Sequence, residues 1–359
     1  MDENNMNYNE GNYYQVRKVV TLNVKRPIIT YILIIVNVAM WALLNYISLR
    51  TGRSYSQLLF DFGAKININI INGQYWRFIT PIFLHADFTH LLVNCYSLYA
   101  VGPTVERIYG KGKFLFIYVT AGFMGSLLSF MFSINPSVGA SGAIFGLLGT
   151  LLYFGVEFPN LFKIYFGRSI LITLAINLAY GFMNTGIDNF GHMGGLLGGF
   201  LASGIVKVKD NNRKWYLSKT IFILLTIVIG ASGLVYGFNY GNNNVLVKLE
   251  ELYKYDSNQN WKEAASLGEE ILNQKPTNKN IKIEVLWITT KAEAITGNYN
   301  KAVEYAKTLA KLSPKDGHYM LGIVYYDMGQ FEQAKQELQR AKTLNAPYSN
   351  IDDLINSIR

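Results

Sequence analysis

Four polar residues lie inside or beside long apolar segments of this sequence. They are His90, Asn94, Ser141 and His192. Such residues are functional candidates, because a strongly polar or ionisable side chain is unfavourable in a membrane segment. A serine hydroxyl becomes a nucleophile when a neutral imidazole takes its proton, and the imidazole can return that proton to a leaving amine. Ser141 and His192 could therefore catalyse acyl transfer at a peptide bond.

The sequence around Ser141 predicts where its helix begins. Asn135-Pro136 interrupts helical structure shortly before it, so a helix is expected to start near Ser141. The free N–H groups and the partial positive charge at a helix N-terminus suit an oxyanion, which forms when a serine attacks a carbonyl. Gly139 and Gly142 flank Ser141 and let backbone and substrate approach closely.

A second glycine-rich segment contains the candidate base. His192 lies among Gly191, Gly195 and Gly199, a stripe of small residues that allows close helix packing in lipid. That packing could bring His192 against the helix of the candidate nucleophile. Asp188, four residues before His192, is a candidate to orient the imidazole, although it is expected to face the outer loop.

The composition predicts a membrane protein. Half of the 359 residues are apolar and only 16% are charged, which is typical of membrane spans rather than of an average soluble protein. The net charge is +9, with 18 Lys and Arg against 9 Asp and Glu in residues 1–247 and 15 against 15 in residues 248–359. We interpret the excess as loop charge that sets membrane orientation, and no nucleic-acid partner is expected. A single cysteine, Cys95, excludes an intrachain disulfide.

Seven apolar segments are predicted to be helices. They cover roughly residues 27–47, 88–103, 114–134, 141–158, 169–184, 190–206 and 219–239. The first, third and seventh have the roughly 20 apolar residues that a full span requires. The other four are shorter or interrupted, so their ends must lie against protein or water within the bilayer depth.

The basic residues between these segments predict the orientation. With the N-terminus inside, the cytoplasmic segments contain 14 Lys and Arg, whereas the outer segments before residue 240 contain 4. This bias favours a cytoplasmic N-terminus, and seven spans then place residues 240–359 outside the cytoplasm.

His90 and Asn94 are four residues apart and share a helix face. In this topology they lie, with Ser141 and His192, near the outer ends of even-numbered spans and hence at one depth.

The remaining segments complete the domain organisation. Residues 1–26 are polar and lack the apolar core of a signal peptide, so a cytoplasmic tail is expected. Residues 48–87 are too polar to span, and their Trp76 suits the headgroup level, so we expect a partly helical interfacial loop on the outer side. Residues 207–244 are interpreted as a linker and the seventh span, and residues 245–359 as a soluble helical domain.

The last region contains an internal repeat. Trp261-Lys-Glu-Ala264, Tyr299-Asn-Lys-Ala302 and Phe331-Glu-Gln-Ala334 are predicted to start equivalent helices, at offsets of 38 and 32 residues. Gly297 and Gly329 each lie two residues before the aromatic residue, whereas the first unit has Gln259 there. The pattern resembles tetratricopeptide repeats, which recur at about 34 residues as helix pairs. A generic helical bundle is the alternative, and either would be a binding or spacing module.

Together these residues resemble the rhomboid family of intramembrane serine proteases over about residues 27–206. The similarity rests on an ordered set, namely Trp76-Arg77, His85, His90-Leu-Leu-Val-Asn94, Glu106-Arg107, Gly139-Ala-Ser141-Gly142, and His192 with its glycines. The resemblance implies an all-α fold, a polytopic membrane bundle with a six-helix core. To that core this chain would add a seventh span and the soluble repeat domain. It also implies cleavage of membrane-anchored proteins in or near a transmembrane segment, without a cofactor.

The resemblance further implies roles for single residues. Ser141 and His192 would form a catalytic dyad, while His90 and Asn94 would donate hydrogen bonds to the oxyanion together with the Ser141 N–H group. Phe145 would pack beneath the His192 ring. The expected supporting residues are Gly139, Gly142, Phe145, His85, Trp76, Arg77, Gly195 and Gly199. Glu106 and Arg107 are expected to be a structural pair at the cytoplasmic interface.

Several alternatives stay open from the residues alone. A serine or histidine in a span can simply bond a neighbouring helix. His85, His90 and His192 could bind a metal, although no carboxylate or cysteine completes the set, and no metal is expected. A rhomboid-like adaptor could present membrane clients to another protease and use the repeats to recruit partners. A small-solute transporter would need an inverted repeat, and no matching signal is found.

These interpretations define the expected partners and location. The partners are membrane-protein substrates with a transmembrane segment, the lipid bilayer, and a protein bound by the repeats. The location is a plasma membrane, with several spans and a composition rich in Asn, Ile and Lys that suggests a bacterial source. The N-terminus would be cytoplasmic and the repeat domain extracytoplasmic.

Overall fold

The fold is taken from a computed structural model of the chain, which describes residues 26–184, 186–208, 214–239 and 242–358. The described residues form helices joined by turns and short connections, with one isolated antiparallel bridge between Lys65 and Ser137. The predicted all-α fold is therefore confirmed. The chain divides into two compact units, residues 1–240 and residues 241–359, and each is described by itself.

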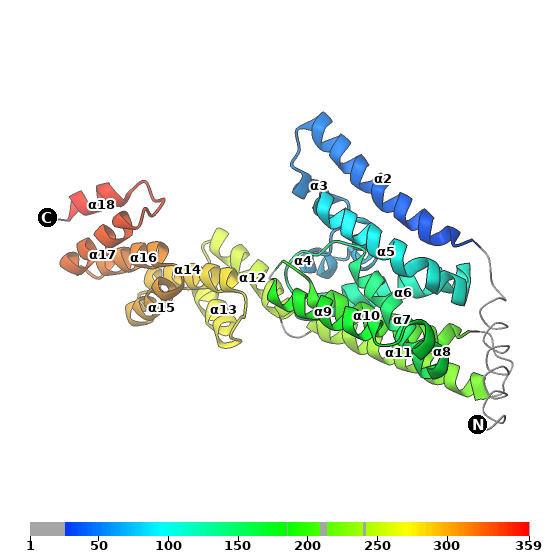
Figure 1. Ribbon diagram of the computed structural model, residues 1–359. Helices are drawn as coiled ribbons and strands as arrows, with labels where there is room; N and C mark the ends of the chain where they lie inside the picture. The colour runs from blue at the N-terminus through cyan, green and yellow to red at the C-terminus, as the bar shows by residue number, and fades with distance from the viewer. Residues whose placement is uncertain (1–25, 185, 209–213, 240–241, 359) are drawn as a thin grey trace, which may run out of the picture. The chain divides into compact units, whose positions relative to one another are not determined.

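The first unit contains a helix for each predicted apolar segment (Figure 1). These are α2 (Ile28–Thr51), α5 (Phe88–Tyr109), α6 (Lys111–Phe132), α7 (Ser141–Glu157), α9 (Ser169–Met183), α10 (Asn189–Val206) and α11 (Lys214–Asn239). By length and composition, α2, α6 and the apolar stretch of α11 from Ser218 can cross a membrane. A short helix, α8 (Pro159–Tyr165), forms a fourth candidate with α9 if that pair, bent by 74°, is one span. The unit is thus that of a multi-pass membrane protein.

The helix of the second apolar segment extends well beyond its predicted end. The second helix was expected to end at residue 103, but α5 continues to Tyr109 with Pro103 inside it. Proline removes one backbone hydrogen bond from a helix. Packing outweighs that loss, because Val105 and Tyr109 beyond the proline are buried. Tertiary contacts therefore override the local signal to stop.

The centre of the first unit is formed by α6, α7 and α10, with α10 packed against both of the others. Two pairs of glycines make this packing close. Gly194 and Gly198 face α6, where an added Cβ would lie 2.4 Å and 2.7 Å from atoms of Met124. Gly195 and Gly199 face α7, where an added Cβ would lie 1.9 Å from a backbone oxygen in each case. Small residues on two faces of α10 therefore set its distance from both neighbours.

A buried carboxylate caps the N-terminus of α2. Glu106, on α5, accepts hydrogen bonds from Ile29 N at 2.9 Å, Thr30 N at 2.8 Å and Thr30 Oγ1 at 2.7 Å. The first N–H groups of a helix lack partners within it, and a negative charge there interacts favourably with the helix dipole. Glu106 thus joins α5 to α2, and no ion pair links it to Arg107 among the described residues.

Replacing Glu106 by leucine is expected to lower the free energy of unfolding by about 3 kcal/mol, because two buried N–H groups and one hydroxyl lose their acceptor. Thr30→Val removes only the hydroxyl donor, so a loss of about 1 kcal/mol is expected. Thermal unfolding of both variants in one detergent measures the difference. Equal losses would contradict a cap made chiefly through the backbone of α2.

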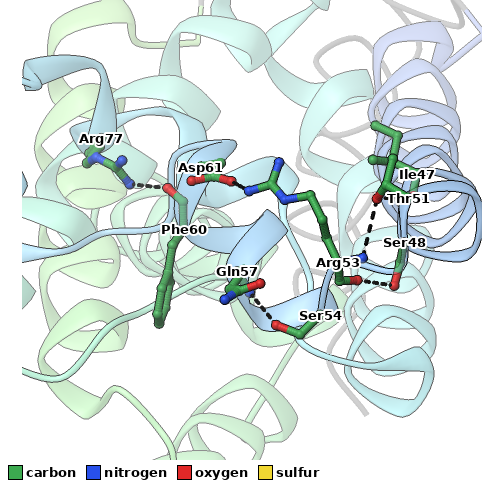
Figure 2. A network of polar contacts seen from close by, with 9 residues as sticks. All are labelled: Ile47, Ser48, Thr51, Arg53, Ser54, Gln57, Phe60, Asp61 and Arg77. Carbon is green, nitrogen blue, oxygen red and sulfur yellow. Dashed lines mark hydrogen bonds and ion pairs between the residues drawn. The ribbon is translucent and has the colours of Figure 1, made fainter.

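The connection between α2 and α5 is partly helical, as predicted. It contains α3 (Tyr55–Asp61), α4 (Asn67–Ile71), η2 (Tyr75–Phe78) and η3 (Thr80–Phe83). Arg77 is buried and donates to the carbonyl oxygens of Phe60 at 2.8 Å and Ala64 at 2.7 Å. Figure 2 shows the contact of Arg77 with Phe60 on α3. It also shows the ion pair of Asp61, the last residue of α3, with Arg53, which precedes that helix. The guanidinium of Arg77 therefore fastens η2 to the end of α3.

The second unit is a series of helix pairs. Its helices are α12 (Asn242–Ser257), α13 (Trp261–Asn273), α14 (Lys279–Ile295), α15 (Tyr299–Leu312), α16 (Pro314–Asp327), α17 (Phe331–Thr343) and α18 (Ile351–Ser357). Helices α13, α15 and α17 begin at the three aromatic residues of the predicted repeat. Three residues further on, Ala264, Ala302 and Ala334 are fully buried. The repeated small residues therefore lie where paired helices meet.

The turn before each of these helices keeps one geometry. Gly297 and Gly329 have φ values of 84° and 73°, and Gln259 has a φ of 60°. A residue with a Cβ in this left-handed region costs about 1 kcal/mol relative to glycine. The first repeat thus has Gln259 in place of glycine but keeps the same left-handed turn conformation.

Candidate active site

The segment that leads to Ser141 is fixed by backbone hydrogen bonds. Lys65 N donates to Ser137 O at 2.9 Å, and Ser137 N donates to Lys65 O at 3.0 Å. Gly139 N then donates to Pro81 O at 2.9 Å. The φ of Gly139 is 127°, a conformation that favours glycine. Since α7 begins at Ser141, the serine lies at a helix N-terminus, where the sequence predicted it.

Ser141 and His192 lie within hydrogen-bond distance. Ser141 Oγ is 2.8 Å from His192 Nε2, although the two residues are 51 positions apart. Facing glycines make this approach possible, since a Cβ on Gly142 would lie 3.2 Å from Gly191 O and a Cβ on Gly195 would lie 1.9 Å from Gly142 O. The glycine stripe around His192 therefore packs against the helix of Ser141.

The His192 ring is held in its plane by Phe145. The two ring centroids are 4.2 Å apart and the planes differ by 9°. Nδ1 of His192 is buried and has no hydrogen-bond partner among the described residues. Stacking fixes the orientation of the ring but not the position of its proton. With the proton on Nδ1, Nε2 is free to accept the proton of Ser141.

His90 also borders the segment that leads to Ser141. A Cβ on Gly139 would lie 2.7 Å from His90 Nε2 and 3.8 Å from Ser141 Oγ, so the imidazole and the hydroxyl border the same glycine. His90 Nδ1 accepts a long hydrogen bond from Ala86 N at 3.4 Å. That bond favours the tautomer in which Nε2 has the proton and can donate.

Asn94 is buried one turn after His90, on the same helix face. Its Nδ2 donates to His90 O at 2.8 Å, and its Oδ1 has no partner among the described residues. An amide has two N–H groups, so one donor of Asn94 is used by its own helix and the other is free for a further acceptor.

His85, Trp76 and Arg77 are three further predicted supporting residues. His85 is fully buried with its ring centroid 5.4 Å from that of His90, and its ring nitrogens have no partners among the described residues. Trp76 is 56% exposed. Arg77 holds the connection between α2 and α5 through the carbonyl oxygens of Phe60 and Ala64. Within the described ranges, no group of three His, Cys, Asp or Glu residues could hold a metal ion.

Lys65 is a structural residue that the sequence analysis treated only as a loop charge. Its side chain is fully buried, and Nζ donates to Ser133 O at 2.8 Å and Asn67 Oδ1 at 2.9 Å. Burial lowers the pKa of Lys65 to about 8. The end of α6 and the segment before Ser141 are thereby joined to one lysine. A lysine ten residues before Tyr75-Trp76 in a polar connection gives no sign of such burial in the sequence.

Comparison with known proteins is consistent with this geometry. A family model described as the rhomboid domain matches residues 72–209, and one described as a tetratricopeptide repeat matches residues 316–348. Rhomboid protease GluP of Bacillus subtilis (strain 168) is 35% identical over 302 residues, which are 84% of this chain and 58% of GluP. The chain thus spans little more than half the length of that relative.

Two further relatives match shorter parts of the chain. YdcA of Bacillus subtilis (strain 168), whose name also contains "rhomboid protease", is 36% identical over 192 residues, which are 52% of this chain and 92% of YdcA. RHOMBOID-like protein 1 of Arabidopsis thaliana is 39% identical over 154 residues, which are 41% of this chain and 39% of that protein. The match to YdcA covers nearly all of that relative at more than a third identity. The chain belongs to the rhomboid family.

Proposed function

We propose that the protein is an intramembrane serine endopeptidase that cleaves membrane-anchored proteins in or near a transmembrane segment, with Ser141 as nucleophile and His192 as general base. The observation that carries the proposal is the 2.8 Å separation of Ser141 Oγ and His192 Nε2 inside a membrane protein of this family. A nucleophile within hydrogen-bond reach of its base is the arrangement that covalent catalysis requires.

The proposed chemistry proceeds in two steps. Ser141 Oγ attacks the scissile carbonyl carbon while His192 Nε2 takes its proton, and the imidazolium then protonates the leaving amine as the C–N bond breaks. Water next attacks the acyl-enzyme, gives its proton to His192, and releases the carboxylic acid and the free hydroxyl of Ser141.

The oxyanion formed in each step would lie between two kinds of donor. The backbone N–H of Ser141 belongs to the free N–H groups at the start of α7. His90 Nε2 borders Gly139 on the same side as the Ser141 hydroxyl. The free N–H of Asn94 is the third proposed donor, since the other N–H is bound to His90 O. Fixed donors at the developing charge lower the barrier more than they stabilise the substrate.

The substrate must expose a peptide bond to this site. A membrane helix hides its carbonyl groups in its own hydrogen bonds, so we propose substrates whose helix unwinds locally at small or helix-breaking residues.

The repeat domain is proposed to bind a protein partner. We further propose a bacterial plasma membrane, a cytoplasmic N-terminus and an extracytoplasmic repeat domain, on the charge bias of the loops.

Labelling by a fluorophosphonate, which reacts with activated serines, tests the nucleophile directly. We expect the full-length protein in detergent to be labelled and Ser141→Ala to remain unlabelled, because only a serine beside a base reacts rapidly. Intensity after gel electrophoresis measures the reaction. Equal labelling of both proteins would overturn the assignment of Ser141. Capture of membrane clients with full biological effect by Ser141→Ala would favour the adaptor instead.

A further inference from the structure

Asp188 caps the helix that contains His192. Its Oδ1 accepts a hydrogen bond from Gly191 N at 2.9 Å, and its carbonyl oxygen accepts one from His192 N at 3.1 Å. The carboxylate lies close against this first turn, since a Cβ on Gly191 would be 2.9 Å from Asp188 Oδ2. The negative charge is therefore held by backbone contacts within one turn of the imidazole.

The position of Gly191 is itself fixed by the neighbouring helices. A Cβ on Gly125 of α6 would lie 2.8 Å from Gly191 O, and one on Gly142 of α7 would lie 3.2 Å from it. The turn that places the Asp188 carboxylate is thus wedged between α6 and α7. Motion of this carboxylate relative to Ser141 is correspondingly restricted.

The imidazole of His192 lies where a positive charge is unfavourable. It is in the first turn of α10, and the N-terminus of a helix carries a partial positive charge that opposes a cation. Its Nδ1 has no hydrogen-bond acceptor among the described residues, so no direct partner stabilises an imidazolium. A nearby carboxylate would stabilise the imidazolium electrostatically, without a direct hydrogen bond.

Other ionisable groups on neighbouring elements interact with Asp188 or His192. Asp188 and His90 both interact electrostatically with His192, with opposite signs. From the connection between α3 and α4, buried Lys65 also interacts with the Asp188 carboxylate. The corresponding cap of α5, Asp87, accepts from His90 N at 2.8 Å and therefore lies beside the other histidine. Asp188 is the carboxylate that acts on the proposed base.

We propose that Asp188 is a positioning residue whose negative charge stabilises the imidazolium that forms when His192 takes the proton of Ser141. The proton passes from Ser141 Oγ to His192 Nε2 and later to the leaving amine, and it does not pass through Asp188. This inference rests on the proposed function. It differs from a purely structural cap because it requires the charge and not only the hydrogen bond to Gly191.

Two substitutions separate the charge from the cap. Asn caps helices as well as Asp does, so Asp188→Asn should keep the bond to Gly191 and remove only the charge. We expect its melting temperature to stay near that of the wild type and its kcat to fall about fivefold, with KM unchanged. The acid limb of its pH profile should move down by about 0.5 to 1 pH unit, because His192 then remains neutral at lower pH. Asp188→Ala should in addition lose stability.

The controls make each outcome decisive. Asp61→Asn removes a half-exposed carboxylate of the loop between α2 and α5 and should leave the acid limb in place. A wild-type pH profile and kcat in Asp188→Asn, with a stability loss in Asp188→Ala, would leave Asp188 a structural cap and overturn the proposal. Asp188→Ser provides a second neutral cap, and failure of both neutral variants to fold would also overturn it. If wild type does not cleave, or Ser141→Ala does, the proposed function fails instead.

Discussion

Cleavage of a membrane-anchored substrate is expected to slow by about a thousandfold or more in Ser141→Ala, and by a similar factor in His192→Ala. The two side chains share one hydrogen bond of 2.8 Å, and a serine hydroxyl without its base is a poor nucleophile. Initial rates of product formation by the purified full-length protein, with a substrate that has one transmembrane segment, measure both losses. The stability of Ser141→Ala should change little, because it removes only a hydroxyl, whereas His192→Ala also loses the ring stacked on Phe145 and should be less stable.

The double variant provides the sharper measurement. Residues that act as one unit are not additive, so Ser141→Ala with His192→Ala should cleave no more slowly than either single variant. Ser97→Ala is a matched control, since Ser97 is a half-buried serine on α5 and should cleave at the wild-type rate. If the losses in the double variant multiplied, the two side chains would act independently, and the dyad would be rejected.

Much of the fold could be predicted because its determinants are local. Long apolar runs mark the membrane helices, and the aromatic residue that begins each repeat marks the start of α13, α15 and α17. The contacts between distant segments could not be predicted in this way. Glu106 accepts a hydrogen bond from Thr30 N, 76 residues earlier in the chain, and no local pattern distinguishes that role from an ion pair with its neighbour Arg107. Likewise, Pro103 predicts a helix end, and only the burial of Tyr109 shows why α5 continues.

The candidate site shows the same division. Residue type and membrane depth predicted that Ser141 and His192 would lie near each other, because the glycine stripe restricts which helix faces can meet. Depth and helix face do not determine which acceptor a side chain uses, and so the bond from Asn94 to His90 O could not be foreseen. Asp188 was expected to face the outer loop, and the hydrogen bond that it accepts from Gly191 N could not be foreseen either. Turn geometry decides such contacts, and a sequence specifies it only weakly.

Gly199→Ala is expected to damage both stability and cleavage although it lies two helical turns from His192. A Cβ there would be 1.9 Å from Gly146 O and 2.5 Å from Gly146 Cα. Both are backbone atoms of α7 and cannot rotate away, so α10 must shift as a whole. Overpacking of this kind lowers the free energy of unfolding by roughly 1–3 kcal/mol. His192 moves with its helix, and a displacement of about 1 Å from the reacting geometry can slow catalysis about a hundredfold.

Gly112→Ala is the matched control for this prediction. Gly112 is also helical, on α6, and no atom lies within 4 Å of the position that its Cβ would take. Alanine is the better helix former, so its melting temperature should be unchanged or slightly higher and its cleavage rate unchanged. Thermal unfolding and cleavage of both variants in one detergent give the comparison. Wild-type stability and rate in Gly199→Ala would mean that the contact between α7 and α10 does not set the distance between Ser141 and His192. A loss confined to that variant implies that the distance is determined by backbone contact, because Gly199 has no side chain that could reach the reacting atoms.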